Sequence, residues 1–375
     1  MSKLEVKVQK IFRIVEHPNA DRMELAIIGG EGGYQTCVGK GEFKSGDLCV
    51  YFPIDSVLPS DVEETIFGKD AKVKLKNSRV RTIKLRGALS QGLAVPLHTF
   101  DQTQYARSKD FILGEDLTKH LGVVKYEPPK KDSPTQSHGK ASEKDYNPNF
   151  FKYTDIDHLK NYSEMLNGAF IAVFEKIHGT NFRAGWVLRE PKTRWERLKK
   201  RLGLFSNWQF VYGSHNVQLQ GKDRGKNTKN MPVDVYTKMV KKYDLINRLI
   251  FGEVIYAEIY GYGIQKNYHY GCGIDEQKMV VVDLKKDDNY VNAAELLNWS
   301  IINGFDTPPL LYIGSFSMLK MDQLAGGPSS LSKDQKVREG IVVRPVRERR
   351  GHAGRMIYKL HNPEYLLLKG NSEYH

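Results

Sequence analysis

A polar, proline-rich stretch in the middle of the chain restricts the folds that the chain can adopt. Residues 125–150 read KYEPPKKDSPTQSHGKASEKDYNPNF and contain almost no aliphatic side chains, although apolar runs are frequent on both sides. This composition is typical of a linker, because it offers nothing to bury in a core. We therefore expect two domains, at residues 1–124 and 151–375, each long enough for its own core.

The first segment consists of short apolar or alternating runs separated by Gly, Pro and Asp turns. These runs occupy residues 4–15, 23–30, 48–54 and 81–97. The pattern predicts a small β-barrel. The run His17-Pro-Asn-Ala-Asp21 resembles the start of the OB domains attached to tRNA synthetases, which implies a barrel of the OB type. Such barrels bind single-stranded nucleic acids.

Basic and aliphatic residues alternate between positions 74 and 86. On a strand, this alternation places most of the charges on one face, where they would meet the phosphates of RNA. The RNA contacts expected in this domain are Arg79, Arg81, Lys84 and Arg86. An ordinary solvated strand face explains the pattern equally well. His17 and Asp21 are expected to be turn and cap residues rather than ligands.

Strand-like and helical segments alternate in the second domain. Strands are expected at residues 169–175, 182–188, 256–261, 278–284 and 340–345, and helices at 163–169, 193–202, 233–250 and 292–302. The prediction is an α+β protein in which the barrel precedes a domain of antiparallel sheets and helices. The helix at 193–202, TRWERLKKRL, is strongly basic; a solvated face is the simpler interpretation and an RNA-contacting surface is the alternative.

The balance of charges indicates a polyanionic partner. The chain has 57 Lys and Arg against 44 Asp and Glu, a net charge of +13, and each neutralised phosphate releases counterions. Nucleic acid is the first candidate and an anionic membrane surface the second. We find neither a signal peptide nor an apolar stretch that could span a bilayer. The three cysteines form no metal-binding spacing, and we expect a cytoplasmic or otherwise intracellular location.

The run Phe174-Glu175-Lys176-Ile177-His178-Gly179-Thr180-Asn181-Phe182-Arg183 carries the strongest chemical signal. An apolar strand delivers a lysine at its end, and a glycine three residues later permits a sharp turn into a second strand. Free lysine has a pKa of about 10.4, so it needs burial or a nearby cation to become a nucleophile. Lys-x-x-Gly alone is common and also fits a hairpin with an exposed lysine.

This run resembles motif I of RNA ligases of the RNA ligase 2 type, which belong to the covalent nucleotidyltransferase superfamily. Other segments resemble the later motifs in the same order, at residues 212–216 (Ia), 256–266 (III), 278–284 (IIIa), 338–344 (IV) and 358–362 (V). Such an order is much harder to obtain by chance than any single motif. The resemblance covers residues from about 150 to 370, and the preceding barrel fits the subfamily that has an N-terminal OB domain.

The resemblance implies a role for individual residues. Lys176 is expected to attack the α-phosphorus of ATP and form a lysyl-AMP, while Lys359 stabilises the charge on that phosphate. Glu258 and Glu339 are expected to hold the ribose or a hydrated Mg²⁺ or Mn²⁺. The other expected contacts with ATP or AMP are Glu175, Ile177, Asn181 and Val282, and the expected RNA contacts in this domain are Asn181, Arg183 and His215.

Two positions depart from the family pattern. His215 stands where an arginine usually follows the serine of motif Ia, and His361 replaces the second lysine of motif V. Because a histidine in place of the motif V lysine can change its charge near neutral pH, His361 predicts activity that changes between pH 6 and 8. The sequence around Glu253 is also similar to motif III, but the residues that follow Glu258 align the family pattern on Glu258 instead.

The implied activity is ATP-dependent joining of RNA ends in RNA repair. After Lys176 becomes adenylated, the RNA 5′-phosphate takes the AMP, and a 3′-hydroxyl then attacks the adenylated end and expels AMP. The expected partners are ATP and an RNA with 3′-hydroxyl and 5′-phosphate ends, nicked or single-stranded, and the protein is expected to be a monomer. A non-catalytic tRNA- or RNA-binding protein with an OB domain is the alternative, but it gives no reason for the motif order.

Overall fold

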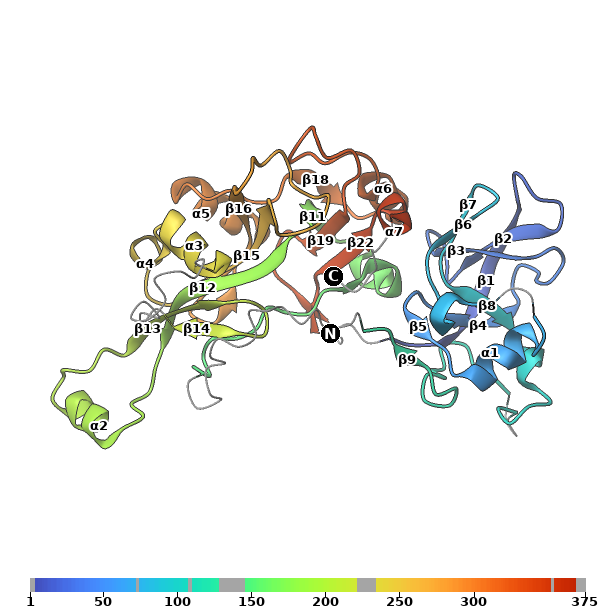
Figure 1. Cartoon of the computed structure of the whole chain (residues 1–375), viewed down its shortest axis with the longest axis horizontal. Helices are drawn as coiled ribbons and strands as arrows, with labels where there is room; N and C mark the ends of the chain where they lie inside the picture. The colour runs from blue at the N-terminus through green and yellow to red at the C-terminus, as the bar shows by residue number, and fades with distance from the viewer. Residues whose placement is uncertain are drawn as a thin grey trace.

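The computed structural model describes residues 4–71, 74–106, 110–127, 146–220, 234–351 and 354–368. Within these ranges, a β-barrel domain is followed by an α+β domain (Figure 1). The expected fold class is therefore confirmed. Most of the expected linker, residues 128–145, lies outside the described residues, and the domain limits remain a proposal. No helix in the described ranges is long and apolar enough to cross a membrane.

The first domain is built on a five-stranded antiparallel sheet with the order β3-β2-β1-β4-β8. Its elements are β1 (Lys7–Glu16), β2 (Met23–Ile28), β3 (Tyr34–Gly39), β4 (Leu48–Phe52), β5 (Ser56–Val57), α1 (Ser60–Phe67), β6 (Ile83–Leu85), β7 (Ala88–Ser90), β8 (Leu93–Pro96) and β9 (Val124–Lys125). Inward-facing residues of β1 and β4, such as Val8 and Val50, form its core. A register shift between Ile11 and Arg13 lets the long strand β1 bend.

The barrel is closed where β3 meets residues 89–92. The backbone N–H of Gln91 donates to the carbonyl of Gln35 at 2.7 Å, and the amide of Gln35 donates to the carbonyl of Leu89 at 2.8 Å. The hydroxyl of Ser90 accepts a hydrogen bond from the backbone of Cys37 at 3.0 Å. These bonds satisfy backbone groups that would otherwise form an open edge of the sheet.

The His17–Asp21 run fastens the β6–β7 hairpin to the barrel. The ring Nε2 of His17 lies 3.2 Å from the carbonyl of Leu85, and the Asn19 amide donates to the carbonyl of Arg86 at 3.1 Å. Arg86 and Gly87 both have positive φ, 45° and 93°, as a two-residue hairpin turn requires. His17 and its neighbour Asn19 are thus turn residues that hold part of the fold.

The second domain contains a five-stranded and a six-stranded sheet. The first has the order β10-β22-β19-β11-β18 and the second β14-β13-β12-β15-β16-β17. The strands are β10 (Asp157–His158), β11 (Phe170–Lys176), β12 (Thr180–Leu188), β13 (Trp208–Gly213), β14 (Gln218–Gln220), β15 (Glu253–Gly261), β16 (Gln277–Lys286), β17 (Asn289–Tyr290), β18 (Leu310–Ser315), β19 (Gly340–Pro345), β20 (Arg350–Gly351), β21 (Gly354–Arg355) and β22 (Tyr358–His361). The α-helices are α2 (Arg194–Arg201), α3 (Val235–Lys242), α4 (Leu245–Arg248), α5 (Ala293–Ile302), α6 (Met318–Ala325) and α7 (Pro363–Leu367).

Helices cover the outer faces of both sheets, and the inner faces meet each other. Helices α3 and α5 pack on the six-stranded sheet, and α6 packs on the five-stranded sheet. Between the sheets, partly buried Val342 of one sheet packs against the buried cluster that contains Tyr256 of the other. Two helix predictions are corrected. The segment 163–169 forms only a 3-10 turn, Ser163–Leu166, and 233–250 divides into α3 and α4 at Asp244, which has a φ of 48°.

The two domains touch at β3 and a 3-10 helix, Leu159–Asn161. The hydroxyl of Tyr34 lies 3.0 Å from Nδ1 of His158, and the ammonium of Lys160 donates to the carbonyl of Gly33 at 3.0 Å. Ile54 of the barrel also belongs to the buried cluster that contains Ile177. The barrel therefore borders the segment that follows Lys176.

Candidate active site

Lys176 is the last residue of β11, and its ammonium meets a buried carboxylate. The Nζ of Lys176 donates to Oε1 of Glu339 at 2.7 Å, although 163 positions separate the two residues in sequence. The lysine side chain is 15% exposed and that of Glu339 is fully buried. The strand end thus delivers an amine that is held in place and still open to a ligand.

The register of the five-stranded sheet places three basic side chains on one face. Lys176 pairs with Gly340 in β19, and Gly340 pairs with His361 in β22. Lys359 lies two residues before His361, so these side chains share a face with Lys176. Because Gly340 has no side chain, nothing stands between Lys176 and His361 in this row.

The second strand of the motif I hairpin joins the other sheet and brings in another carboxylate. Asn181 of β12 pairs directly with Glu258 of β15, so both side chains face the same way. A Cβ on Gly179 would lie 2.2 Å from the carbonyl oxygen of Ile259. Its φ lies outside the left-handed region. The glycine is therefore needed for this close approach, and not for the sharp turn that we expected.

Glu339 is the electrostatic centre of the site. Nδ1 of His178 lies 3.6 Å from its Oε1, and Nε2 of His361 lies 3.9 Å from the same oxygen. Burial by itself raises the pKa of a carboxyl group, but the charge of Lys176 and the contact with His178 outweigh it and lower the pKa of Glu339 to about 2. Glu339 is thus an anion at every pH at which the protein works.

Glu258 has the opposite protonation behaviour. Burial raises the pKa of its carboxyl group to about 8; the charge of Lys176 opposes this shift and that of Glu339 adds to it. Two neighbouring carboxyl groups with pKa values pushed so far apart are characteristic of acid–base and metal sites rather than of a structural core.

A cation held by Glu258 predicts that adenylation of the protein rises about tenfold per pH unit below a midpoint near pH 8, because this carboxyl group would have to lose its proton before binding the cation. Raising Mg²⁺ should move this midpoint to lower pH, since the cation competes with the proton. The initial rate of protein–AMP formation between pH 6 and 9.5 at two Mg²⁺ concentrations tests this. Glu258→Gln should lose the titration. A midpoint that does not respond to Mg²⁺ would contradict the assignment.

The same region contains polar atoms that lack a partner. Oε2 of Glu339 and Oδ1 of Asn181 are buried and have no hydrogen bond, which is costly unless a ligand supplies the partner. No group of three or more His, Cys, Asp or Glu in the described ranges is placed to hold a metal ion. Glu258 and Glu339 nevertheless fit Mg²⁺ or Mn²⁺, which accept one or two carboxylates and complete their shell with phosphate oxygens and water.

Glu175 points to the other side of β11 and holds a neighbouring loop. Its carboxylate accepts hydrogen bonds from the hydroxyl of Ser329 at 2.5 Å and from the backbone of Ser330 at 2.6 Å. Arg338 binds the same loop through the carbonyl of Pro328 at 2.9 Å. Burial raises the pKa of Glu175. A contact with adenine would use the lone pairs that these bonds leave free.

Aromatic residues surround the site, and they were not among the site residues expected from the sequence. The ring of His178 packs edge-on against Tyr268, with centroids 4.8 Å apart, and lies 5.3 Å from Tyr365. The hydroxyl of Tyr270 accepts a hydrogen bond from the backbone N–H of His178 at 2.8 Å. The sequence signal was present, because Tyr268 and Tyr270 follow motif III and Tyr365 follows motif V.

Two expected site residues, Ile177 and Arg183, are buried, whereas Val282 and His215 are half-buried. Ile177 packs in a cluster with Tyr260, and Val282 lies at the register shift of β16. Arg183 is 2% exposed and donates to the carbonyls of Ser214 at 3.0 Å and Phe150 at 2.6 Å, which gives it a role within the framework. Burial lowers the pKa of His215, so that its ring is neutral at pH 7. Glu253 accepts a hydrogen bond from Trp299 at 2.9 Å.

The basic residues of the barrel do not lie on one continuous strand, which corrects our expectation. Strand β6 covers only Ile83–Leu85, and Lys76–Ser78 form a 3-10 helix instead. The guanidinium of Arg79 binds Asp55 at 2.9 Å through Nε and stacks 3.5 Å over the ring of Tyr126. Arg81 is half-buried, whereas Lys84 and Arg86 are exposed. Of the four residues, Lys84 and Arg86 are thus the most open to RNA.

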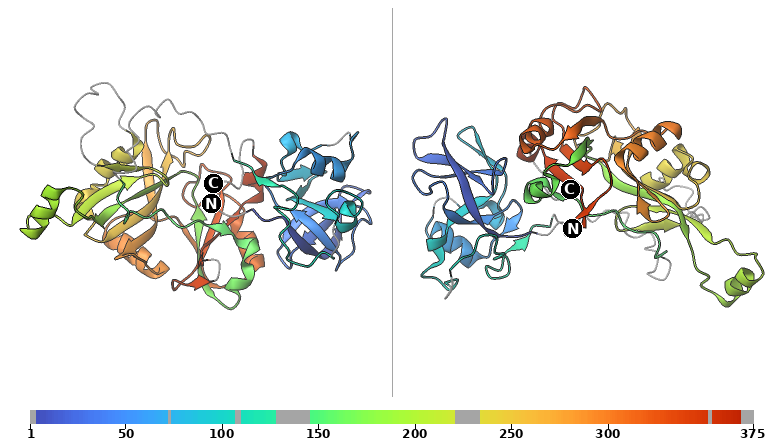
Figure 2. Two further views of the ribbon diagram at one scale, coloured as in Figure 1. Left: turned by 90° about the horizontal axis from the view of Figure 1, so that it is seen from below. Right: turned by 180° about the vertical axis from the view of Figure 1, so that it is seen from behind.

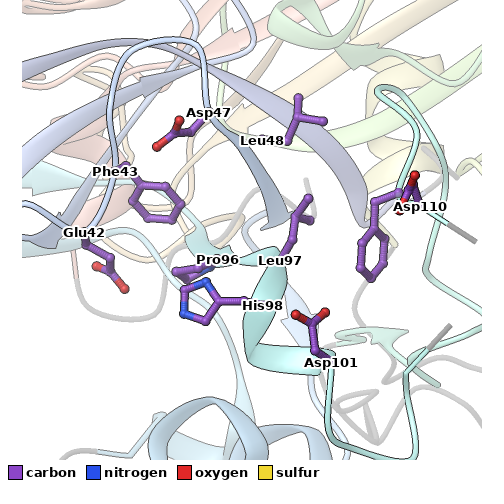
Figure 3. Close-up of a pocket in the computed structure, with 10 residues that line it drawn as sticks. Glu42, Phe43, Asp47, Leu48, Pro96, Leu97, His98, Asp101 and Asp110 are labelled. Carbon is purple, nitrogen blue, oxygen red and sulfur yellow. The ribbon is translucent and has the colours of Figure 1, made fainter.

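A pocket of about 630 Å³ lies in the barrel, away from Lys176 (Figure 3). Phe43 and Leu97 contribute apolar walls, and four acidic side chains line it, Glu42, Asp47, Asp101 and Asp110. Carboxylates repel phosphates, so this pocket does not suit ATP or RNA. This pocket is therefore not a candidate nucleotide site.

Comparison with known proteins agrees with this geometry. A family model described as RNA ligase matches residues 169–361, and a model described as an OB-fold domain matches residues 5–97. No curated protein sequence matches the chain significantly.

Solved structures of Naegleria gruberi RNA ligase are similar to this one. A variant without ligand aligns with a TM-score of 0.68 and 23% identity, over 96% of this chain and 97% of that chain. A variant with ATP and Mn gives 0.68 and 23%, over 97% and 98%, and a complex with PPi gives 0.66 and 22%, over 98% of each chain. Likeness at this identity shows a shared fold. The RNA ligase model matches more than half of the residues of this chain. The chain therefore belongs to the RNA ligase family, with an OB-fold domain ahead of the ligase domain.

Proposed function

We propose that this chain is an ATP-dependent RNA ligase that joins RNA 3′-hydroxyl and 5′-phosphate ends through a covalent lysyl-AMP on Lys176. The observation that carries the proposal is the 2.7 Å contact between Lys176 and the buried Glu339, on a sheet face that also bears Lys359. An amine, a fixed anion and a second cation at one place are the groups that nucleotidyl transfer to a lysine requires.

The reaction divides into three displacements. Nζ of Lys176 attacks the α-phosphorus of ATP; a P–N bond forms, the bond to pyrophosphate breaks, and Nζ loses a proton. A 5′-phosphate oxygen of RNA then attacks the AMP phosphorus, the P–N bond breaks, and the lysine takes back a proton. Finally, a 3′-hydroxyl loses its proton, attacks the 5′-phosphate and expels AMP.

Each side chain of the site has a task in this scheme. Glu339 orients Nζ of Lys176, and Lys359 neutralises charge that develops on the α-phosphate. Glu258 and Glu339 would hold Mg²⁺ or Mn²⁺, which would shield the phosphate oxygens from the attacking amine. Asn181, whose Oδ1 has no partner, is placed to bind the nucleotide or the RNA end. The Naegleria ligase has been solved with ATP and Mn, which supports this choice of ligands.

The remaining expectations complete the proposal. The RNA partner carries 3′-hydroxyl and 5′-phosphate ends at a nick or on single strands, and Lys84 and Arg86 of the barrel contact it. Glu175, Ile177 and Val282 contact the adenine of the nucleotide, and His215 contacts the RNA. We also propose that the protein acts as a monomer inside the cell. No feature of the site favours a purely RNA-binding function.

Labelling of the protein by its own reaction tests the proposal. Purified protein incubated with α-labelled ATP and Mg²⁺ should acquire label that survives denaturation and is released by acid, as a phosphoramidate is. Labelled GTP is the matched control and should give none. Adding an RNA with a 5′-phosphate should transfer the label from protein to RNA. Failure of ATP to label the protein would overturn the proposal.

A further inference from the structure

The connection between β12 and β13 carries a helix that stands apart from the body of the domain. Helix α2 lies at the end of the molecule farthest from the barrel in all views (Figures 1 and 2). None of its residues is buried. Since helices of this length derive little stability from their own hydrogen bonds, an unpacked helix of eight residues needs other support.

Local contacts within residues 189–205, here called the arm, supply that support. Thr193 and Glu196 form a capping box at the start of α2. Arg189 forms an ion pair with Glu196, and its guanidinium lies 4.6 Å from the ring centre of Phe205. Lys200 pairs with Glu190 at 2.9 Å. The arm is thus preformed, so binding through it costs little ordering entropy.

The surface of the arm is strongly basic and partly apolar. The arm, residues 189–205, contains seven Lys and Arg and two Glu, which gives a charge of +5 out of +13 for the chain. Arg194, Arg197 and Arg201 recur with helical spacing and form no ion pair among the described residues. A neighbouring row consists of Trp195, Leu198 and Leu202, of which Trp195 is 74% exposed.

We propose that the arm is a second RNA-binding surface, which grips the sugar–phosphate backbone of the RNA whose end lies at Lys176. This rests on the proposed ligase function. Strand β12 runs from Thr180 beside the site to Leu188 at the root of the arm, a rise of roughly 26 Å. RNA duplexes adopt the A form, and about one turn of such a duplex is long enough to reach both places.

The chemistry of the arm matches RNA better than it matches a lipid surface. The arginines suit phosphate oxygens, which they bind in a bidentate manner. The flat ring of Trp195 packs on a ribose or an unpaired base. The apolar row has only three residues, which is too little for stable anchoring in a bilayer.

The test removes the arginine row and compares it with an equal loss of charge elsewhere. The variant carries Arg194→Gln, Arg197→Gln and Arg201→Gln, and the matched control carries Arg347→Gln, Arg349→Gln and Arg350→Gln, which are also exposed. The arm variant should bind a nicked duplex of 24 base pairs at least about tenfold more weakly than the unaltered protein. The slope of its log binding constant against log salt concentration should become less steep by about 2 to 3. The arm variant and the unaltered protein should bind a duplex of six base pairs equally well, because so short a duplex does not reach the arm from Lys176.

Lysyl-AMP formation from ATP should stay within about twofold in the arm variant, because α2 lies outside the nucleotide site. An unchanged thermal midpoint is expected, since no side chain of α2 is buried. Equal weakening in both triple variants would overturn the proposal. So would unchanged RNA binding together with arm-dependent binding to phosphatidylserine vesicles. Absence of lysyl-AMP in the unaltered protein would contradict the ligase function instead, and would leave the binding result on the arm valid.

Discussion

Replacing Lys176 by arginine is expected to abolish the transfer of AMP from ATP to the protein, by more than about 10³-fold. Arginine keeps the positive charge beside Glu339 and so preserves the ion pair, but its guanidinium does not lose a proton in proteins and cannot act as the nucleophile. Labelling with α-labelled ATP measures the effect. Lys176→Ala should be equally inactive, and it also leaves the buried carboxylate without its partner.

The same variant separates the nucleophile from the rest of the site. If Lys176 acts only in the first two displacements, Lys176→Arg should still seal RNA that already carries AMP on its 5′-phosphate. Lys286→Ala is a suitable control, because Lys286 pairs with Glu253 at 3.5 Å in the same domain and is half exposed. It should keep full activity in both assays. Label retained on Lys176→Arg would mean that another residue is the nucleophile.

The sequence predicted the strands of the second domain because their apolar runs are long and bounded by turns. Strands β11, β15 and β19 lie within a few residues of the expected positions. The helices were less predictable. Asp244 adopts a left-handed conformation between α3 and α4, and no periodicity of apolar residues reveals that break. Residues 163–169 have helix-forming residues but too few turns to continue an α-helix.

The motifs in the sequence predicted which residues form the site, but not which of them are in contact. Motif order indicated Lys176, Glu339 and Lys359. Periodicity alone cannot show that Lys176 and Glu339, which are 163 positions apart in the sequence, lie 2.7 Å from each other in the fold. The protonation of Glu258 was also out of reach, because it depends on burial and on the nearby charges of two other residues. The role of Gly179 was misjudged for a similar reason. Its constraint comes from the backbone of β15, which the local sequence does not contain.

Replacing Asp283 by alanine is expected to lower the free energy of unfolding by about 3–5 kcal/mol, because it removes the fully buried anion that two arginines share; their other carboxylate partner, Glu348, is partly exposed. Asp283 of β16 is fully buried and binds Arg344 of β19 at 3.1 Å and Arg355 of β21 at 2.5 Å. It also accepts a hydrogen bond from Tyr153 at 2.9 Å. Although burial opposes ionisation, the two guanidinium groups hold the pKa of Asp283 below its usual value. The carboxylate therefore ties the two sheets together as an anion.

Urea denaturation measures this loss of stability, provided that the slope of the unfolding free energy against urea concentration is the same in both proteins. Asp288→Ala is the matched control. Asp288 lies 3.7 Å from Lys285 just beyond the same strand, but its side chain is 74% exposed, and exposed pairs contribute only about 0–1 kcal/mol. Because Asp283 joins the sheet of Lys176 to that of Glu258, its loss should also slow protein–AMP formation under conditions in which the variant is still folded. Equal midpoints for the two variants would show that the sheets are held together mainly by their apolar contacts, such as those of Tyr256 and Val342.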